Sequence, residues 1–205
     1  MYYVGLDIGK AQDHTAIVIV RRADRLRAWM EPEFEDLGLC FAERVALGTA
    51  YPLVAGRVRE IVMDEKLRGQ VAVAVDATGV GAPIVDMLRA GRLGCEVAAV
   101  TITGGEKASG AGPGNAWSVP KQDLMAGVQV LLERRQLKIA PTLKEAGALV
   151  RELTDVKMTA GARGRLRMGA DGSGEHDDLV VALGLAVWRA MRPMNGFGVR
   201  RLPGI

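Results

Sequence analysis

The chain has 205 residues, of which 49% are hydrophobic and 25% are charged, and its formal net charge is +3. This composition is typical of a soluble protein with one well-buried core, and its longest apolar runs, such as Ala16–Val20, are too short to span a membrane. No signal sequence opens the chain, and Cys40 and Cys95 lack the paired spacing of a zinc site, so we expect a cytoplasmic protein with reduced cysteines. The mild basic excess permits phosphate binding without demonstrating it.

The first third of the chain is predicted to form strands. They are expected at Tyr2–Gly9, Thr15–Arg22 and roughly Leu26–Phe34, with a turn in the polar stretch Arg22–Arg25. The apolar run in the second of them is long enough for a strand that is buried on both faces. Three successive strands with short connections predict an antiparallel meander.

Helices and strands alternate in the middle of the chain. The expected elements are a helix from Pro52 to Lys66, a buried strand over Val71–Asp76, a loop entering a helix over Gly79–Leu88, and a strand over Glu96–Thr103. Such alternation implies parallel pairing in this half of the sheet.

A glycine-rich stretch, 104–119, predicts a break without a regular element. Beyond it we expect a helix from Pro120 through Leu132, a short edge strand Leu137–Ile139, a helix Thr142–Leu153, a hairpin strand Arg163–Met168 and a last helix from about His176 to Met191. Thr142 and Glu145 have the spacing of a capping box. One domain over 1–192 and a tail over 193–205 with little to pack against are expected.

Acidic residues stand at three comparable places in this pattern. Asp7 lies near the end of the first strand, Asp76 ends a central strand, and Asp177 and Asp178 open the last helix. Ligand sites gather at the carboxyl ends of parallel strands, so these carboxylates are expected to meet. A cluster of like charges favours hard cations such as Mg²⁺ or Mn²⁺. Two such ions, roughly 3.5–4 Å apart, can activate water and stabilise the leaving oxygen in phosphodiester hydrolysis.

Each of these carboxylates also has a purely structural interpretation. Asp7 could shape a turn before Gly9, and Asp76 could cap the next helix. Asp177 and Asp178 suit a helix N-terminus for reasons of the helix dipole alone. Only their joint placement favours a site.

The segments that carry these residues resemble, in order and spacing, the C-terminal nuclease domain of phage large terminase subunits. They are Gly5–Gly9, Val75–Gly81, Val119–Leu124 and His176–Leu183. The His-Asp-Asp sequence that opens an apolar helix is the most specific of them, and the resemblance spans roughly residues 1–192. It implies an RNase H-like α/β fold: a mixed central sheet of three antiparallel N-terminal strands followed by parallel strands, flanked by helices.

The resemblance also implies cleavage of double-stranded DNA with two Mg²⁺ or Mn²⁺ ions. Asp7 would be shared between the ions, and Asp76 would bind one of them. Asp178 is the preferred third ligand, because adjacent helical residues point about 100° apart and Asp177 does not serve equally. His176 is a weaker candidate, since hard cations prefer oxygen.

Two departures from the family pattern matter. Val181 stands one helical turn after Asp178, where related nucleases and resolvases often carry another acid. No G-x-x-x-x-G-K-[ST] phosphate loop is present, whereas terminases carry an ATPase motor upstream of this domain. The chain is therefore expected to be an excised nuclease domain or a stand-alone relative. A packaging ATPase domain, the small terminase subunit and the portal are the expected partners, in the cytoplasm of the host.

Basic residues offer candidate DNA contacts. Lys121, at the start of its helix, could contact the scissile phosphate or be a solvated lysine. Arg163, Arg165 and Arg167 alternate along a strand, which would place all three on one face. Such a stripe suits contact with the DNA backbone and makes binding salt-dependent, and a solvated hairpin is the competing explanation.

Other functions remain open. A sugar- or acetate-kinase-like ATPase shares the G-x-D-x-G strand but needs a much longer chain. A Holliday-junction resolvase shares the chemistry and would act on branched DNA. A non-catalytic DNA-binding module would bind without metal or cleavage. Some transposases open with a similar strand followed by a lysine, as in Gly9-Lys10, but the later segments fit the terminase pattern better.

Overall fold

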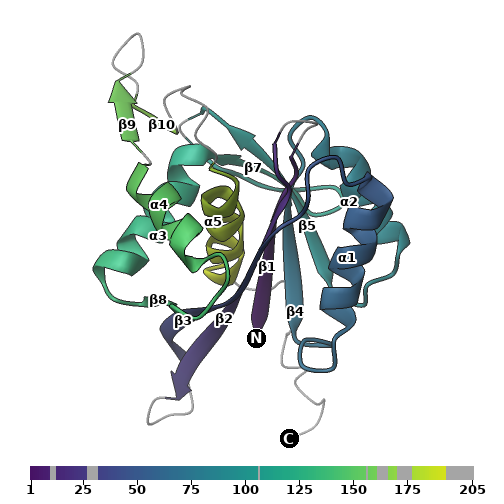
Figure 1. Ribbon diagram of the computed structural model, residues 1–205, viewed down its shortest axis with the longest axis horizontal. Helices are drawn as coiled ribbons and strands as arrows, with labels where there is room; N and C mark the ends of the chain where they lie inside the picture. The colour runs from purple at the N-terminus through teal and green to yellow at the C-terminus, as the bar shows by residue number, and fades with distance from the viewer. Residues whose placement is uncertain are drawn as a thin grey trace, which may run out of the picture.

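The computed structural model describes residues 1–9, 13–26, 32–105, 107–155, 157–160, 166–169 and 177–192. Within them an eight-stranded sheet lies between two layers of helices (Figure 1). Its strands are β1 (Tyr2–Asp7), β2 (Ala16–Leu26), β3 (Pro32–Arg44), β4 (Val71–Asp76), β5 (Glu96–Thr103), β6 (Ser109–Gly112), β7 (Ala116–Pro120) and β8 (Leu137–Ile139). The helices are α1 (Tyr51–Met63), α2 (Gly81–Ala90), α3 (Lys121–Glu133), α4 (Ala146–Asp155) and α5 (Asp178–Ala190).

The strand order is β6-β7-β5-β4-β1-β2-β3-β8. β1 pairs antiparallel with β2 and parallel with β4, and β2 pairs antiparallel with β3. β5 and β7 extend the parallel half, while β8 adds a short parallel strand beside β3. The predicted mixed sheet, with three antiparallel N-terminal strands followed by parallel strands, is confirmed.

Each face of the sheet has its own hydrophobic core. α1 and α2 cover one face, and α3, α4 and α5 cover the other (Figure 1). β1 and β4 are apolar on both faces because both faces are covered. α5 is buried along its whole length, which explains why its sequence is apolar almost all round. The last helix is thus a core element that runs directly behind the central strands.

The predicted turn at Arg22–Arg25 is wrong, because these residues lie inside β2. β2 pairs with β3 along its whole length, and Arg22 and Asp24 form an ion pair of 2.8 Å. Hydrogen bonding to a long partner strand outweighs the local turn preference. As a result, the third strand ends at Arg44, well beyond the predicted Phe34.

The predicted break over 104–119 is wrong as well. This stretch contains β6 and most of β7, and β7 pairs parallel with β5. Hydrogen bonds to a preformed neighbouring strand compensate for the entropic cost of ordering glycine-rich backbone. β7 thereby leads straight into α3, whose first residue is Lys121.

The predicted capping box at Thr142 is also wrong. The chain turns through residues 141–145, and the Ala146 amide donates a hydrogen bond of 3.0 Å to the Leu143 carbonyl. α4 then begins at Ala146. Local turns after Pro141 take up the segment in which the capping box was expected.

Two expectations lie largely or wholly outside the described residues. A small hairpin of β9 (Lys157–Ala160) and β10 (Leu166–Gly169) is present where a hairpin strand was predicted. The tail, 193–205, is not among the described residues. Of the helices that are described, none is both long and apolar enough to cross a membrane.

Candidate metal centre at the ends of the central strands

The register of the sheet brings the first two predicted carboxylates together. Leu6 of β1 lies opposite Val75 of β4 in the parallel pair, so Asp7 and Asp76 follow them at the same edge. Both strands end there, which leaves the two side chains at the carboxyl ends of neighbouring parallel strands.

The N-terminus of α5 lies at the same edge. Asp178 is the first residue of the helix and Asp177 is its N-cap. A cavity of about 350 Å³ is lined by residues from all three segments and from two loops: Asp7, Ile8, Gly9, Asp13, Asp76, Thr78, Gly79, Val80, Asp177 and Asp178. The structure therefore brings together all four aspartates that the sequence singled out.

These carboxylates destabilise one another's charges. Burial, and then the charges of Asp76, Asp178 and Asp177, raise the pKa of Asp7 well above its ordinary value. Burial also raises the pKa of Asp76, while hydrogen bonds from Thr78, the charge of Lys121 and a hydrogen bond with Asp7 limit that rise. A cluster of this kind gains most from a bound cation.

The donor set fits a hard divalent cation, because all four aspartates offer only oxygen ligands. Within the described residues, however, no three His, Cys, Asp or Glu side chains are already placed to hold a metal ion together. Repulsion between like charges opposes such an arrangement when no cation is present. Lys121 also draws Asp177 away from a shared metal position, since its Nζ pairs with Asp177 Oδ2 at 2.5 Å.

The two adjacent aspartates of α5 have different surroundings. Asp178 is 7% exposed, whereas the Asp177 side chain is 27% exposed and is paired with Lys121 of α3. They project differently from the start of the helix, as expected for consecutive residues. His176, the weaker candidate, lies outside the described residues.

Thr78 fixes the loop after β4, and sequence reasoning gave it no such role. Its backbone amide donates to Asp76 Oδ1 at 2.8 Å, and its hydroxyl accepts a hydrogen bond of 2.9 Å from the Ile102 amide of β5. Asp76 is thus oriented by a loop that is itself tied to the next strand. The Asp-x-Thr spacing is a common turn signal, so the sequence alone could not assign this function.

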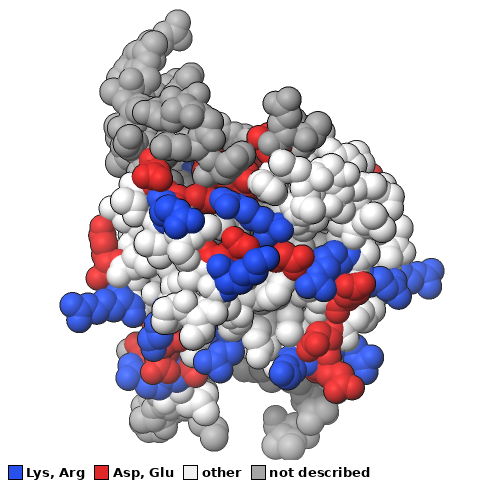
Figure 2. Space-filling model, viewed as in Figure 1, with Lys and Arg blue, Asp and Glu red and all other residues white. Residues whose placement is uncertain are grey.

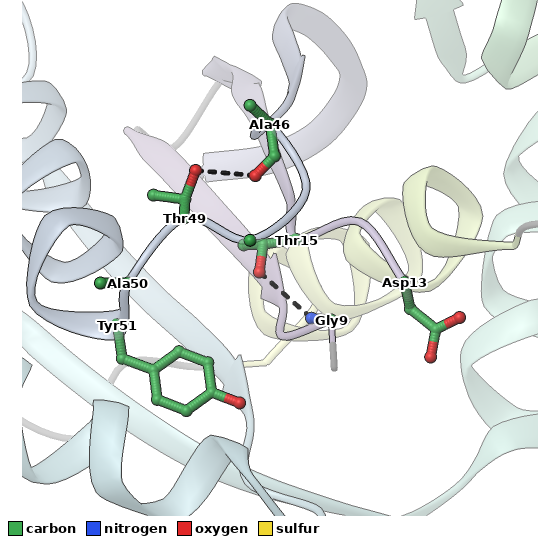
Figure 3. Close-up of a pocket in the computed structure, with 8 residues that line it drawn as sticks. Gly9, Asp13, Thr15, Ala46, Thr49, Ala50 and Tyr51 are labelled. Atoms are coloured by element: carbon green, nitrogen blue, oxygen red, sulfur yellow. Dashed lines mark hydrogen bonds between the residues drawn. The ribbon is translucent and has the colours of Figure 1, made fainter. Parts of the chain in front are cut away.

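Asp13 is a second residue that sequence reasoning missed. It lines the carboxylate cavity and also a neighbouring cavity of about 400 Å³, formed with Gly9, Thr15, Ala46, Gly48, Thr49, Ala50 and Tyr51 (Figure 3). The Thr15 hydroxyl accepts a hydrogen bond of 3.1 Å from the Gly9 amide at the junction of the two. An acid in a loop has no periodic pattern that would reveal its placement, and its position six residues after Asp7 is the only signal available.

Glu152 of α4 is a buried acid close to the cavity, and it too was missed. Burial raises its pKa to about 7 and outweighs the opposing effects of the Val180 amide and of Arg44, with which it pairs. The nearby charge of Asp178 raises the pKa further. In the sequence, Glu152 is one acid among many on an amphipathic helix, so nothing marked it as buried.

The predicted DNA contacts are only partly within the described residues. Lys121 borders the site through its pairing with Asp177, whereas Arg163 and Arg165 lie outside and only the backbone of Arg167, in β10, is described. On the face seen in Figure 2, basic and acidic side chains lie next to one another. Among the described residues on this face, acidic side chains therefore interrupt the basic ones.

No protein-family model matches the chain, and no curated protein matches its sequence. Its structure is similar to the large terminase nuclease from the thermophilic phage G20c, with a TM-score of 0.62, 22% identity and coverage of 92% of this chain and 82% of that one. It is similar to the g2p large terminase nuclease domain from the bacteriophage SPP1, solved with bound Mn, with a TM-score of 0.55, 16% identity and coverage of 93% and 86%. The human cytomegalovirus terminase nuclease domain, Mn soaked, gives a TM-score of 0.54, 10% identity and coverage of 91% and 81%. The chain thus has the RNase H-like fold of the large terminase nuclease domains.

Proposed function

We propose that this chain is a metal-dependent endonuclease that hydrolyses phosphodiester bonds of double-stranded DNA, as in the nuclease step of viral genome packaging. The observation that carries the proposal is the convergence of Asp7, Asp76, Asp177 and Asp178 on one cavity, from three separate segments of a fold shared with terminase nucleases. A purely structural role for each aspartate does not account for their meeting, because four clustered carboxylates cost stability.

Asp7, Asp76 and Asp178 would hold two Mg²⁺ or Mn²⁺ ions, with Asp177 as a further ligand. Similar structures have been solved with magnesium and with manganese bound, which supports a divalent cofactor. Bound ions would supply an activated water and stabilise the leaving oxygen of the broken bond. The protein's own part is to place Asp7 among the other three carboxylates and to orient Asp76 through its hydrogen bond from the Thr78 amide.

Lys121 has two roles open to it in this proposal. Its Nζ neutralises Asp177 as long as no cation is bound. Once a divalent cation takes over that charge, the same ammonium group is available to contact a DNA phosphate beside the site. Further contacts with the DNA backbone are assigned to Arg163, Arg165 and Arg167, as predicted from their alternation.

The expected partners follow from the same proposal. A packaging ATPase domain, the small terminase subunit and the portal would deliver the DNA, in the cytoplasm of the host cell. This chain is similar to the HK97 large terminase over only 39% of that longer protein, so the motor function would reside in the remainder.

The test is cleavage of a supercoiled plasmid by the purified chain with Mg²⁺, with Mn²⁺ and with EDTA. We expect nicking or linearisation with either metal and none with EDTA. Asp178→Asn should reduce the rate by at least about 10²-fold, because it removes the negative charge of a metal ligand without changing side-chain size. Asp86→Asn is the matched control, since Asp86 is an exposed acid of α2 outside the cavity.

Three other results would assign the chain differently. Preferential cleavage of four-way junctions over plasmid would support a resolvase-like nuclease. DNA binding that is independent of metal and is followed by no cleavage would support the non-catalytic module. Cleavage that resists EDTA and survives Asp178→Asn would refute a metal mechanism at this site.

A further inference from the structure

The N-cap residue of α5 does not cap the helix with its own side chain. Asp177 occupies the N-cap position but makes no side-chain hydrogen bond to the helix, because its carboxylate pairs with Lys121. The first amides of a helix have no partner within the helix, and they need one from elsewhere. Water is excluded here, since Leu179 and Val180 are 0% and 1% exposed.

A side chain from another helix supplies the missing acceptor. Glu152 Oε2 accepts a buried hydrogen bond of 3.0 Å from the Val180 amide in the first turn of α5. The other carboxylate oxygen, Oε1, pairs with Arg44 at the end of β3. Glu152 therefore joins the first turn of α5 to the edge of the sheet.

The register of the sheet shows what this link fixes. Asp7 lies opposite Ala16 on β2, and Ala16 lies opposite Arg44 on β3. The three residues form one row across the sheet, and residues directly opposite one another point to the same face. Arg44 thus holds Glu152, and through it the start of α5, in the same row as Asp7.

We propose that Glu152, held by Arg44, is a positioning residue that caps α5 from outside and thereby sets Asp178 against Asp7 and Asp76. The inference rests on the proposed metal role of these aspartates. It assigns Glu152 no contact with metal or DNA: the residue acts only through the helix that carries Asp178. Without Glu152, the Val180 amide in the first turn of α5 loses its acceptor, and that turn can shift, so the position of Asp178 relative to Asp7 becomes less fixed.

The opposite end of α5 provides a matched comparison. Arg189, 3% exposed, pairs with Glu96 of β5 at 2.6 Å near the C-terminus of the helix. Each end of α5 is therefore held to the sheet through an ion pair of low exposure: directly by Arg189 and Glu96 at the C-terminus, and through the Val180–Glu152 hydrogen bond to Arg44 at the N-terminus. Of the two, only the N-terminal pair adjoins the carboxylates. If the pairs merely stabilise the fold, removing either one should affect metal binding equally.

The experiment measures Mn²⁺ affinity by isothermal titration calorimetry, together with Tm and amide hydrogen exchange in α5. The principal variant is the double substitution Arg44→Leu with Glu152→Leu, because replacing a buried ion pair by apolar side chains often leaves a protein as stable as before. We expect it to fold with a moderately lower Tm, because the buried Val180 amide loses its acceptor. We also expect it to exchange that amide faster and to bind Mn²⁺ at least about 10-fold more weakly. Glu152→Gln retains an acceptor oxygen and should preserve most of the affinity, while Glu96→Gln should leave it unchanged.

The possible outcomes separate the two proposals. Wild-type Mn²⁺ affinity in the Leu variant, or an equal loss in Glu96→Gln, would overturn the positioning role and leave the proposed function intact. A wild-type chain that binds no Mn²⁺ would contradict the proposed function, and with it this role for Glu152. Faster exchange at Val180 with weaker Mn²⁺ binding, and no such change in Glu96→Gln, would support both.

Discussion

Asp7 is a buried carboxylate at the meeting point of the site's acidic residues. Burial raises the pKa of Asp7 most, and the charges of the three other carboxylates around it, Asp76, Asp178 and Asp177, raise it further. A group whose pKa is raised on folding binds its proton more tightly in the folded state. Its favourable contribution is thus complete at acid pH and is lost as the pH rises through the raised pKa.

Asp7→Asn should accordingly stabilise the metal-free protein while destroying the site. At pH 8 in EDTA we expect a higher Tm than that of the wild type, because a buried repelled charge is replaced by a neutral side chain of the same shape. The difference should shrink as the pH is lowered, because protonation then removes the repelled charge of Asp7. Thermal unfolding from pH 8 downward is the measurement, with Asp86→Asn as the control, and a lower Tm for Asp7→Asn at pH 8 would contradict the argument.

Glu152 predicts a second pH dependence, again with a defined sign. Its pKa rises from 4.5 to about 7 on folding, so the folded state retains the proton that the unfolded state has lost. The stabilising contribution is complete below about pH 4.5 and disappears as the pH rises through 7, which amounts to roughly 3 kcal/mol at most. Glu152→Gln should flatten this part of the stability profile in urea unfolding between pH 5 and 8.5. The exposed Glu65→Gln should leave the profile as it is.

At the scale of elements, the close approach of β1 and α5 sets the geometry of the site. A Cβ atom at Gly5 would lie 1.8 Å from the Ala182 carbonyl oxygen and 2.7 Å from the Ala186 amide nitrogen, both in the backbone of α5. Only glycine permits this approach. The strand that carries Asp7 and the helix that carries Asp178 are therefore in backbone contact one to two helical turns beyond the site.

Gly5→Ala should push α5 away from β1. We expect a loss of several kcal/mol of unfolding free energy, because the obstructing atoms belong to the backbone and cannot rotate away. In protein that still folds, Mn²⁺ binding should weaken as well, since Asp7 and Asp178 move apart. Gly38→Ala is the matched control: Gly38 also lies in a strand, but a Cβ there meets nothing within 4 Å. Equal stability of the two variants in urea would show that α5 adjusts without cost.

Strand boundaries also depend on neighbouring elements. β2 continues through the polar stretch that predicts a turn, and β7 forms in a stretch that predicts none. In both cases a partner strand provides hydrogen bonds that local preferences do not anticipate. The extension of β3 also carries Arg44 to the row of Asp7, where the proposed positioning role needs it.

At the scale of the whole molecule, a cation bound between the sheet and α5 should stabilise the folded state. A ligand that binds only the folded state raises stability by about 2.7 kcal/mol when its concentration is 100 times its Kd. For a chain of this size, that corresponds to a Tm increase of roughly 5–10 °C. We expect a Tm that rises with Mn²⁺ concentration in the wild type and in Asp86→Asn, but not in Asp7→Asn. An equal rise in all three would place the metal elsewhere.

The sequence by itself determined much of this picture. Buried β-branched strands that end on aspartate, helical stripes and the His-Asp-Asp segment led to the mixed sheet, to its helices and to four of the five aspartates that line the cavity. These features are local or periodic, so the chain displays them without reference to its partners. Their order and spacing carried the resemblance to terminase nuclease domains, whose fold the chain has.

Only the tertiary structure decided the rest. It placed Asp13 beside the carboxylates, paired Lys121 with Asp177, and brought Glu152 to the first turn of α5. Glu152 and Val180 are 28 residues apart, and Arg44 and Glu152 are 108 apart. No local pattern encodes such contacts, because they exist only once the sheet register and the packing of α4 and α5 have been fixed together.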